Sequence, residues 1–105
     1  MTTTQAITTA DTLSVFQEAG IYSTNQQQML LRLYGGKQLN MGELARQINK
    51  VNPEGTQAAL VGARDALVEK GYIASTREDR RLKDRRFVYV VITAKGTRLV
   101  EAALS

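Results

Sequence analysis

The sequence predicts a mostly α-helical domain with one small β-hairpin, in the order helix, helix, helix, helix, strand, strand, helix. Polar capping residues precede four runs in which apolar side chains recur every three to four residues. β-Branched and aromatic residues gather instead in one late segment, 87–93, which is typical of a strand. With 105 residues, 43% of them hydrophobic, the chain is large enough for one core. We therefore expect a flexible, Thr-rich N-terminus over residues 1–10 and a single domain over residues 11–105.

Two short helices are expected first. Residues 10–20 have apolar side chains near helical spacing, with Gly20 where a helix would end. The segment 23–36 begins with Ser23, and Gln26 stands three positions later, a spacing typical of a capping box. The apolar face of this second helix would consist of Met29, Leu30, Leu33 and Tyr34.

Two further helices follow. In residues 39–50, Asn40 is placed to cap a helix and an acidic residue stands three positions on. The longest helix, near 53–70, would begin after Asn52, a favoured cap, with Pro53 at the first position, where no backbone donor is needed. The stripe buried by the third helix would be Leu44, Ala45 and Ile48, and the stripe buried by the longest would be Leu60, Ala63 and Leu67.

The last third of the chain predicts a hairpin and a final helix. Residues 72–76 and 87–93 have strand composition, and the charged segment 77–86 would form the tip between them. Thr93 is placed to cap a final helix over residues 94–105.

The absence of certain residue types excludes several classes of function. With no Cys and no His, the chain lacks a thiol nucleophile, an imidazole base and the usual zinc ligands. It also lacks a Gly-rich phosphate loop. We therefore predict that the protein is not an enzyme and has no cofactor or metal. Neither a signal peptide nor a membrane helix is recognisable, so we expect a cytoplasmic protein without membrane contact.

The net charge of +4 is concentrated in one short segment. Residues 77–86 hold six basic and three acidic side chains, which leaves eight basic and seven acidic ones elsewhere. A basic cluster on a nearly neutral domain suggests a polyanionic partner, because Lys and Arg that neutralise phosphates release counterions. For an isolated charge run, a solvated surface loop is the more usual explanation.

The order of elements and one motif resemble the winged helix-turn-helix domain of the MarR family of bacterial and archaeal regulators. Residues 84–96, DRRFVYVVITAKG, fit the wing pattern of that family: Asp, any, Arg, three of any, Val, any, Leu or Ile, Thr, two of any, Gly. Leu44-Ala45 and the segment 69–73, EKGYI, stand where the family has its "ELA" and "EKG-hydrophobic-hydrophobic" segments. The similarity covers residues 22–100.

The resemblance implies binding to double-stranded DNA, with the helix near 53–70 in the major groove and the wing, residues 77–86, on phosphates and the minor groove. Arg86 would be the minor-groove contact, and Asp84 would orient the wing or pair with an arginine. An ordinary surface salt bridge between these two residues is the alternative. The remaining wing residues expected at the DNA are Arg77, Arg80, Arg81, Lys83 and Arg85.

The long helix departs from the family. At 100° per residue, the face opposite its buried stripe carries Ala58, Val61, Gly62, Asp65 and Glu69, none of which donates to base edges. Gln57 is suited to contact adenine and Thr56 to contact phosphate, whereas Arg64 lies nearer the core flank. So small a face would either let the backbone approach DNA closely with weak sequence preference or fit another protein.

The termini also depart from the family, whose members dimerise through long terminal helices, whereas here both terminal helices are short. Apolar residues near the two ends would either form a reduced homodimer interface or complete the core of the single chain. These residues are Leu13, Val15, Phe16, Leu99, Val100 and Leu104.

Two functions are therefore carried forward. The first is a small DNA-binding transcriptional regulator of winged-helix type, acting as a homodimer on a short inverted repeat. The second is a winged-helix module that binds another protein, such as an accessory or host-directed factor of a phage or plasmid. DNA binding predicts a steep salt dependence, and protein binding predicts a partner that is retained at high salt.

Overall fold

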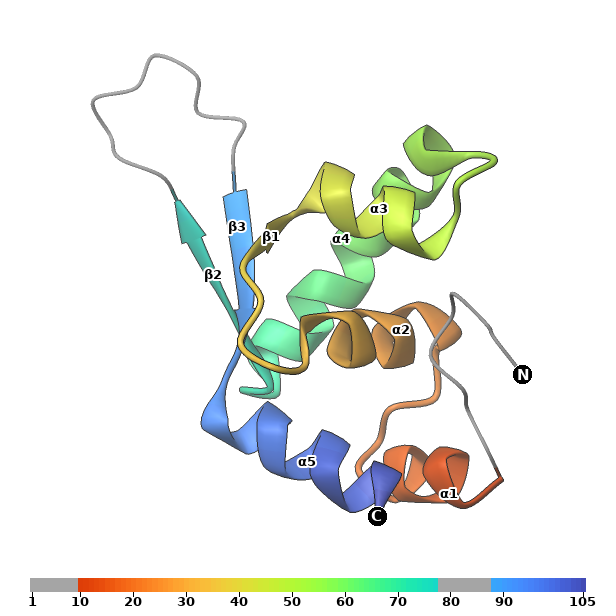
Figure 1. The fold of residues 1–105 in the computed structure, drawn as a ribbon, viewed down its shortest axis with the longest axis vertical. Helices are drawn as coiled ribbons and strands as arrows, with labels where there is room; N and C mark the ends of the chain where they lie inside the picture. Colours follow the sequence, from red (N-terminus) through yellow and green to blue (C-terminus); the bar gives the residue numbers. More distant parts are fainter. Residues whose placement is uncertain (1–9, 78–87) are drawn as a thin grey trace.

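The computed structural model describes residues 10–77 and 88–105 and is mostly helical, with a small antiparallel sheet (Figure 1). Over these residues the chain forms five helices and three short strands. Their order is α1 (Ala10–Glu18), α2 (Thr24–Leu33), β1 (Leu39–Asn40), α3 (Met41–Ile48), α4 (Pro53–Glu69), β2 (Ile73–Arg77), β3 (Val88–Ile92) and α5 (Ala94–Leu104). Except for Ala10, the predicted flexible N-terminus lies outside the described residues.

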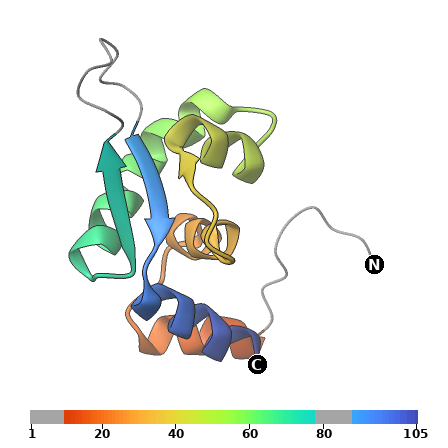
Figure 2. The ribbon, with the colours of Figure 1, turned by 60° about the vertical axis from the view of Figure 1, so that its left-hand side comes forward.

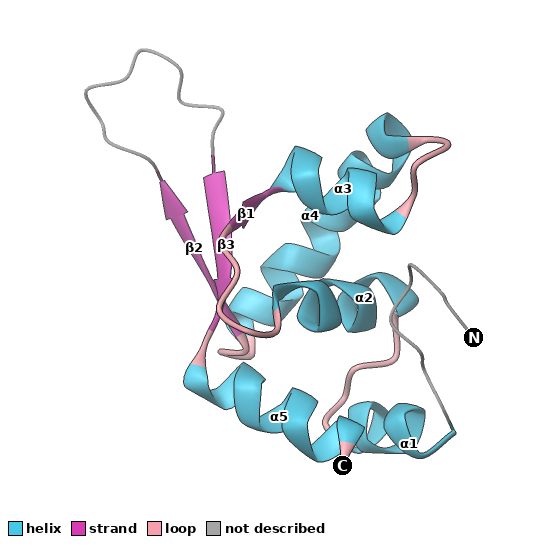
Figure 3. Cartoon of the chain, viewed as in Figure 1, coloured by secondary structure: helices cyan, strands magenta, loops and turns pink. Residues whose placement is uncertain are grey.

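The sheet has one strand more than the sequence predicts. β3 is central, with β2 on one side and the two-residue β1 on the other, and both pairings are antiparallel (Figure 3). Leu39 is opposite Val90 and Asn40 is opposite Tyr89. The predicted order of four helices before the first strand is therefore wrong. The reason is that β1 is too short to show an alternating pattern and is defined only by its pairing with a segment 50 residues away along the chain.

The predicted helix starts are confirmed. At each of four caps the side-chain oxygen accepts a hydrogen bond from the backbone N–H three residues later, which satisfies one free donor of the helix. The pair Asn40 and Glu43 forms a full capping box, because Glu43 Oε1 also accepts from Asn40 N at 3.4 Å. The four caps are Ser23, Asn40, Asn52 and Thr93.

Two helices end at glycines with left-handed backbone. Gly20 and Gly71 both have φ of +83°, a conformation that residues with a side chain rarely adopt. After Gly20, the Ile21 N–H donates to the Phe16 carbonyl at 2.8 Å, which satisfies a carbonyl at the end of α1. The chain reverses at Gly20 toward α2 and at Gly71 toward β2.

The core lies between the helices and the central strand. It consists of apolar side chains from every helix and from β2 and β3. Those with no exposed surface are Phe16, Ile21, Met29, Leu30, Leu33, Leu44, Ala45, Leu60, Leu67, Val90 and Val100. The predicted buried stripe of α4 is confirmed, and in α3 Leu44 and Ala45 are buried as predicted, whereas Ile48 is only half-buried.

The two terminal helices pack side by side at one end of the molecule (Figure 2). The buried hydroxyl of Thr12 in α1 donates to the Ala103 carbonyl in α5 at 2.9 Å. Phe16 and Val100 have no exposed surface. These two residues therefore complete the core of the single chain and cannot contribute to a dimer interface. Of the other residues expected there, Leu104 is exposed and Leu13, Val15 and Leu99 are half-buried.

The start of α5 is fixed to the turn between α4 and β2. Thr93 Oγ1 donates to the Gly71 carbonyl at 2.7 Å, and Lys95 Nζ donates to the Lys70 carbonyl at 2.7 Å. The Lys95 ammonium also lies 4.7 Å from the centre of the Tyr72 ring, within range of a cation–π interaction. We call this part of the molecule, made of α1, α5 and the turn before β2, the closed end.

Candidate nucleic-acid interface

The helix α3 and the beginning of α4 lie at the opposite end of the molecule from α1 and α5 (Figure 1). The end of β2 at Arg77 and the start of β3 at Val88 lie at the same end as α3 and the beginning of α4 (Figures 1 and 2). We call this part the open end. It holds the start of α4 and the strand ends that flank residues 78–87.

An asparagine fixes the turn between α3 and α4. Asn49 Oδ1 accepts hydrogen bonds from the backbone N–H groups of Val51 and Asn52, each at 3.1 Å. Asn52 in turn caps α4, accepting from Gly55 N at 3.2 Å. Both interactions are local to a few residues, so the hydrogen bonds of this turn follow directly from its sequence. The turn leaves Val51 95% exposed.

The outer face of α4 is exposed, as the helical spacing predicts. Val61 is 41% exposed, and a Cβ atom added at Gly62 would have no heavy atom within 4 Å. Two of the six residues on this face are apolar and one is glycine, and the other three carry negative charge. The face consists of Glu54, Ala58, Val61, Gly62, Asp65 and Glu69.

Two polar residues that the sequence assigns to DNA lie on the flanks of α4. Thr56 is half-buried, and its N–H is used within the helix start, donating to the Asn52 carbonyl at 3.1 Å. Gln57 is exposed and reaches toward α3: a Cβ atom added at Gly42 would lie 3.6 Å from Gln57 Oε1 and 3.6 Å from Arg46 Nη1. The side chains of Gln57 and Arg46 thus both lie next to Gly42, where α3 and α4 meet.

The guanidinium of Arg64 forms an ion pair with the carboxylate of Asp65. Its side chain is 22% exposed, and its Nε and Nη2 donate to Asp65 Oδ1 at 3.1 and 3.0 Å. The position of Arg64 toward the core flank is as the sequence predicts. The prediction missed its pairing with the next residue, however, because neighbours along a helix do not normally face each other. Arg64 is therefore a weaker candidate for DNA than its charge implies.

The segment that carries the basic run is only partly described. The backbone of Arg77 ends β2 opposite Val88. The other residues of the run that the sequence assigns to DNA lie outside the described residues: Arg80, Arg81, Lys83, Asp84, Arg85 and Arg86.

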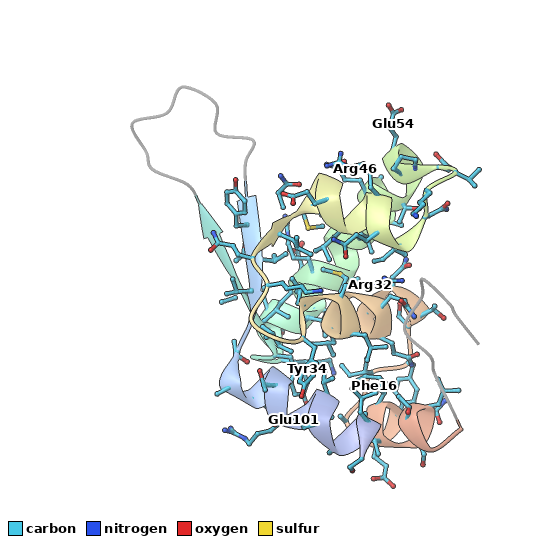
Figure 4. All side chains as sticks on the ribbon, in the orientation of Figure 1. Phe16, Arg32, Tyr34, Arg46, Glu54 and Glu101 are labelled. Atoms are coloured by element: carbon cyan, nitrogen blue, oxygen red, sulfur yellow. The ribbon has the colours of Figure 1, made fainter. Side chains whose placement is uncertain are left out.

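Two basic residues at the open end were missed by the sequence interpretation. Arg46 in α3 and Lys50 just after it are exposed, and neither has an ion-pair partner among the described residues. Arg46 lies on the side of α3 opposite the buried Leu44 and Ala45, so helical spacing was the signal that could have found it. Arg46 and Glu54 extend from the open end, far from Phe16 (Figure 4).

An open hollow of about 530 Å³ separates these basic residues from the start of α4. Its volume lies within the range of ligand pockets, roughly 300–1,000 Å³. The residues that line it are Glu43, Arg46, Gln47, Lys50 and Pro53. The lining thus holds two exposed cations and one half-buried carboxylate, Glu43, which also caps α3, so its net charge is positive.

The described residues contain neither a cluster of metal ligands nor a membrane-spanning helix. Within residues 10–77 and 88–105, no three His, Cys, Asp or Glu side chains lie close enough together to hold a metal ion. None of the helices described above is both long and apolar enough to cross a membrane.

No family model matches this sequence, and no curated protein or solved structure is similar enough to count as a match. Membership of the MarR family therefore stays a prediction from the motifs at residues 44–45, 69–73 and 84–96.

Proposed function

We propose that the chain is a small cytoplasmic DNA-binding regulator of winged-helix, MarR-like type. The single observation that carries this proposal is the convergence at the open end: the strands β2 and β3 lead to residues 77–86 at the same end as α3 and the beginning of α4. That segment holds three of the four net positive charges of the chain. Phosphate neutralisation by such a segment provides most of the affinity for DNA.

In this function α4 lies along the major groove and the β2–β3 wing tracks the neighbouring backbone. The small side chains on the outer face of α4 let its backbone come near the bases. Wing arginines follow the narrow minor groove, where the negative potential of DNA is concentrated. A second copy of the chain would pair through the apolar surface that the terminal helices leave exposed, chiefly Leu104.

The test is fluorescence anisotropy of a labelled random-sequence duplex titrated with the protein at several salt concentrations. We expect the logarithm of the association constant to fall linearly with that of the salt concentration. The double variant Arg80→Ala with Arg81→Ala should reduce the slope by about 1.8 if both residues contact phosphates. Absence of binding at low salt, with the fold intact by circular dichroism, would contradict the proposal.

A second candidate is binding of another protein through the outer face of α4. The specific observation in its favour is charge: from Met41 to Glu69 the chain has three basic and four acidic side chains, a net charge of −1, which repels DNA. A pull-down with immobilised protein discriminates the two functions. A partner retained at high salt, together with no affinity for DNA, would favour this one.

A further inference from the structure

The outer face of α4 offers little with which to distinguish one base pair from another. Specific readout in the major groove depends on side chains such as Arg, Lys, Asn and Gln that form hydrogen bonds to base edges. On the described outer face the only hydrogen-bonding side chains are Glu54, Asp65 and Glu69, and these carboxylates can only accept. Acceptors of this kind can meet only the amino groups of cytosine and adenine, and their charge opposes the phosphates on both sides of the groove.

The side chains of α4 that do carry donors are directed elsewhere. Arg64 donates to Asp65 and is largely covered. Gln57 lies toward α3 beside Arg46, at the edge of α4 and not on its outer face. The helix therefore has no arrangement of donors that would favour one sequence strongly over another.

The unpaired cations of the open end lie on the α3 side instead. Arg46 and Lys50 are exposed beside the hollow of about 530 Å³, and no acidic group among the described residues forms an ion pair with either. Guanidinium and ammonium groups are the usual donors to phosphate oxygens. Phosphate contacts position a protein on DNA but carry no sequence information.

On the basis of the proposed DNA binding, we infer that the hollow between α3 and the start of α4 receives a backbone phosphate, held by Arg46 and Lys50, and that the chain binds duplex DNA irrespective of its sequence. The partner is then DNA as a polyanion of defined shape and not a particular operator. Affinity comes from phosphate contacts, and the outer face of α4 fills the groove without reading it.

The first experiment compares sequences. Dissociation constants are measured at one salt concentration for A·T-rich, G·C-rich and mixed duplexes of equal length, and for the sequences enriched from a random pool by repeated selection. We expect all values to lie within about 100-fold, because specific sites are typically bound about 10³-fold or more above non-specific DNA. A selected sequence bound more than about 100-fold better than the others would overturn the inference and leave the proposed DNA binding intact.

The second experiment tests the contact residues. The double variant Arg46→Ala with Lys50→Ala should lower the salt slope by about 1.8, the loss of two phosphate contacts. The control Lys37→Ala with Arg98→Ala removes the same charge from exposed positions outside the hollow, and should lower the slope by less than about 0.5 because no contact is lost. Equal losses in the two variants would remove Arg46 and Lys50 from the interface.

Calorimetry with inorganic phosphate alone distinguishes a DNA phosphate from a free one. We expect no saturable binding. Saturable binding abolished in the Arg46 and Lys50 variant would assign the hollow to free phosphate and overturn its role toward DNA. If the unmodified protein binds no duplex at any salt concentration, the proposed function itself fails. Sequence-specific binding, or an unchanged salt slope in the Arg46 and Lys50 variant, would overturn only the inference.

Discussion

Gly62 in α4 and Gly96 in α5 both lie within helices, but a Cβ atom would meet opposite surroundings at the two positions. At Gly96 it would overlap the Tyr72 carbonyl oxygen and lie 2.7 Å from Ile92 Cγ1, whereas at Gly62 no heavy atom lies within 4 Å. At Gly96 the packing of the closed end excludes even a methyl group, whereas at Gly62 the outer face of α4 is uncovered. Substitutions at the closed end should therefore mainly change the free energy of unfolding, whereas substitutions at the open end should mainly change binding.

The largest expected effect is at the closed end. Phe16→Ala should lower the free energy of unfolding by about 3–5 kcal/mol, because Phe16 is fully buried and its removal leaves a cavity. Urea denaturation followed by circular dichroism measures this. The control at the open end is Val51→Ala, which should change the same quantity by less than about 0.5 kcal/mol, since Val51 is 95% exposed. A similar loss of unfolding free energy in both variants would contradict the expected difference between the two ends.

A single methyl group at Gly96 should have the next largest effect. Gly96→Ala is expected to destabilise the protein by about 1–3 kcal/mol, because α5 or the turn at Tyr72 must move to make room. The measurement is the same urea midpoint, with the slope of the transition checked for a constant value. An unchanged midpoint would show that α5 can shift away from Tyr72 at no cost.

The same substitution at the open end should act in the opposite direction. Gly62→Ala is expected to stabilise the protein by about 0.5–1 kcal/mol, because alanine restricts the unfolded chain and favours the helix. The change is read from the urea midpoint beside that of Gly96→Ala. A loss of stability at Gly62 would mean that this face is covered in solution, which analytical ultracentrifugation would reveal as self-association.

The smallest expected effect is a pH dependence where α2 meets α5. Tyr34 Oη donates to Glu101 Oε2 at 3.3 Å, and burial, followed by the charge and hydrogen bond of Glu101, raises the pKa of Tyr34. The folded protein thus holds this proton to higher pH than the unfolded chain does. The resulting stability is present below about pH 10 and is lost as the pH rises further.

Tyr34→Phe should make the decline of stability above pH 10 less steep. The control is Tyr22→Phe, which removes a hydroxyl that is not hydrogen-bonded to Glu101 from a side chain that is 71% exposed. Unfolding free energies at pH 8 and above measure both variants. Identical pH profiles for the two would rule out Tyr34 as the origin of the decline.

Local signals predict most of the fold. The caps at Asn40, Asn52 and Thr93 act within three residues, so the helix starts follow directly from the sequence. β1 could not be predicted, because two residues carry no periodicity and their strand character depends on Val90 and Tyr89. Local patterns define the ends of elements, while distant partners define β1.

The candidate site was less predictable than the fold. The exposure of Ala58, Val61 and Gly62 follows from the spacing of the buried stripe of α4. The pairing of Arg64 with Asp65 depends on a side-chain conformation that spacing does not give. Arg46 and Lys50 were missed because two basic residues four apart do not stand out in a sequence whose charge is concentrated at 77–86.

Asn40 has a consequence for how the open end can move. It is the last residue of β1, paired with Tyr89 of β3, and it is also the N-cap of α3, accepting from Glu43 N at 2.8 Å. One residue thus joins the central strand to the first turn of α3 without a spacer. We therefore expect a displacement of β3 to move the start of α3 as well. A force applied to the β2–β3 strands would then reach α3 and, through its packing, α4.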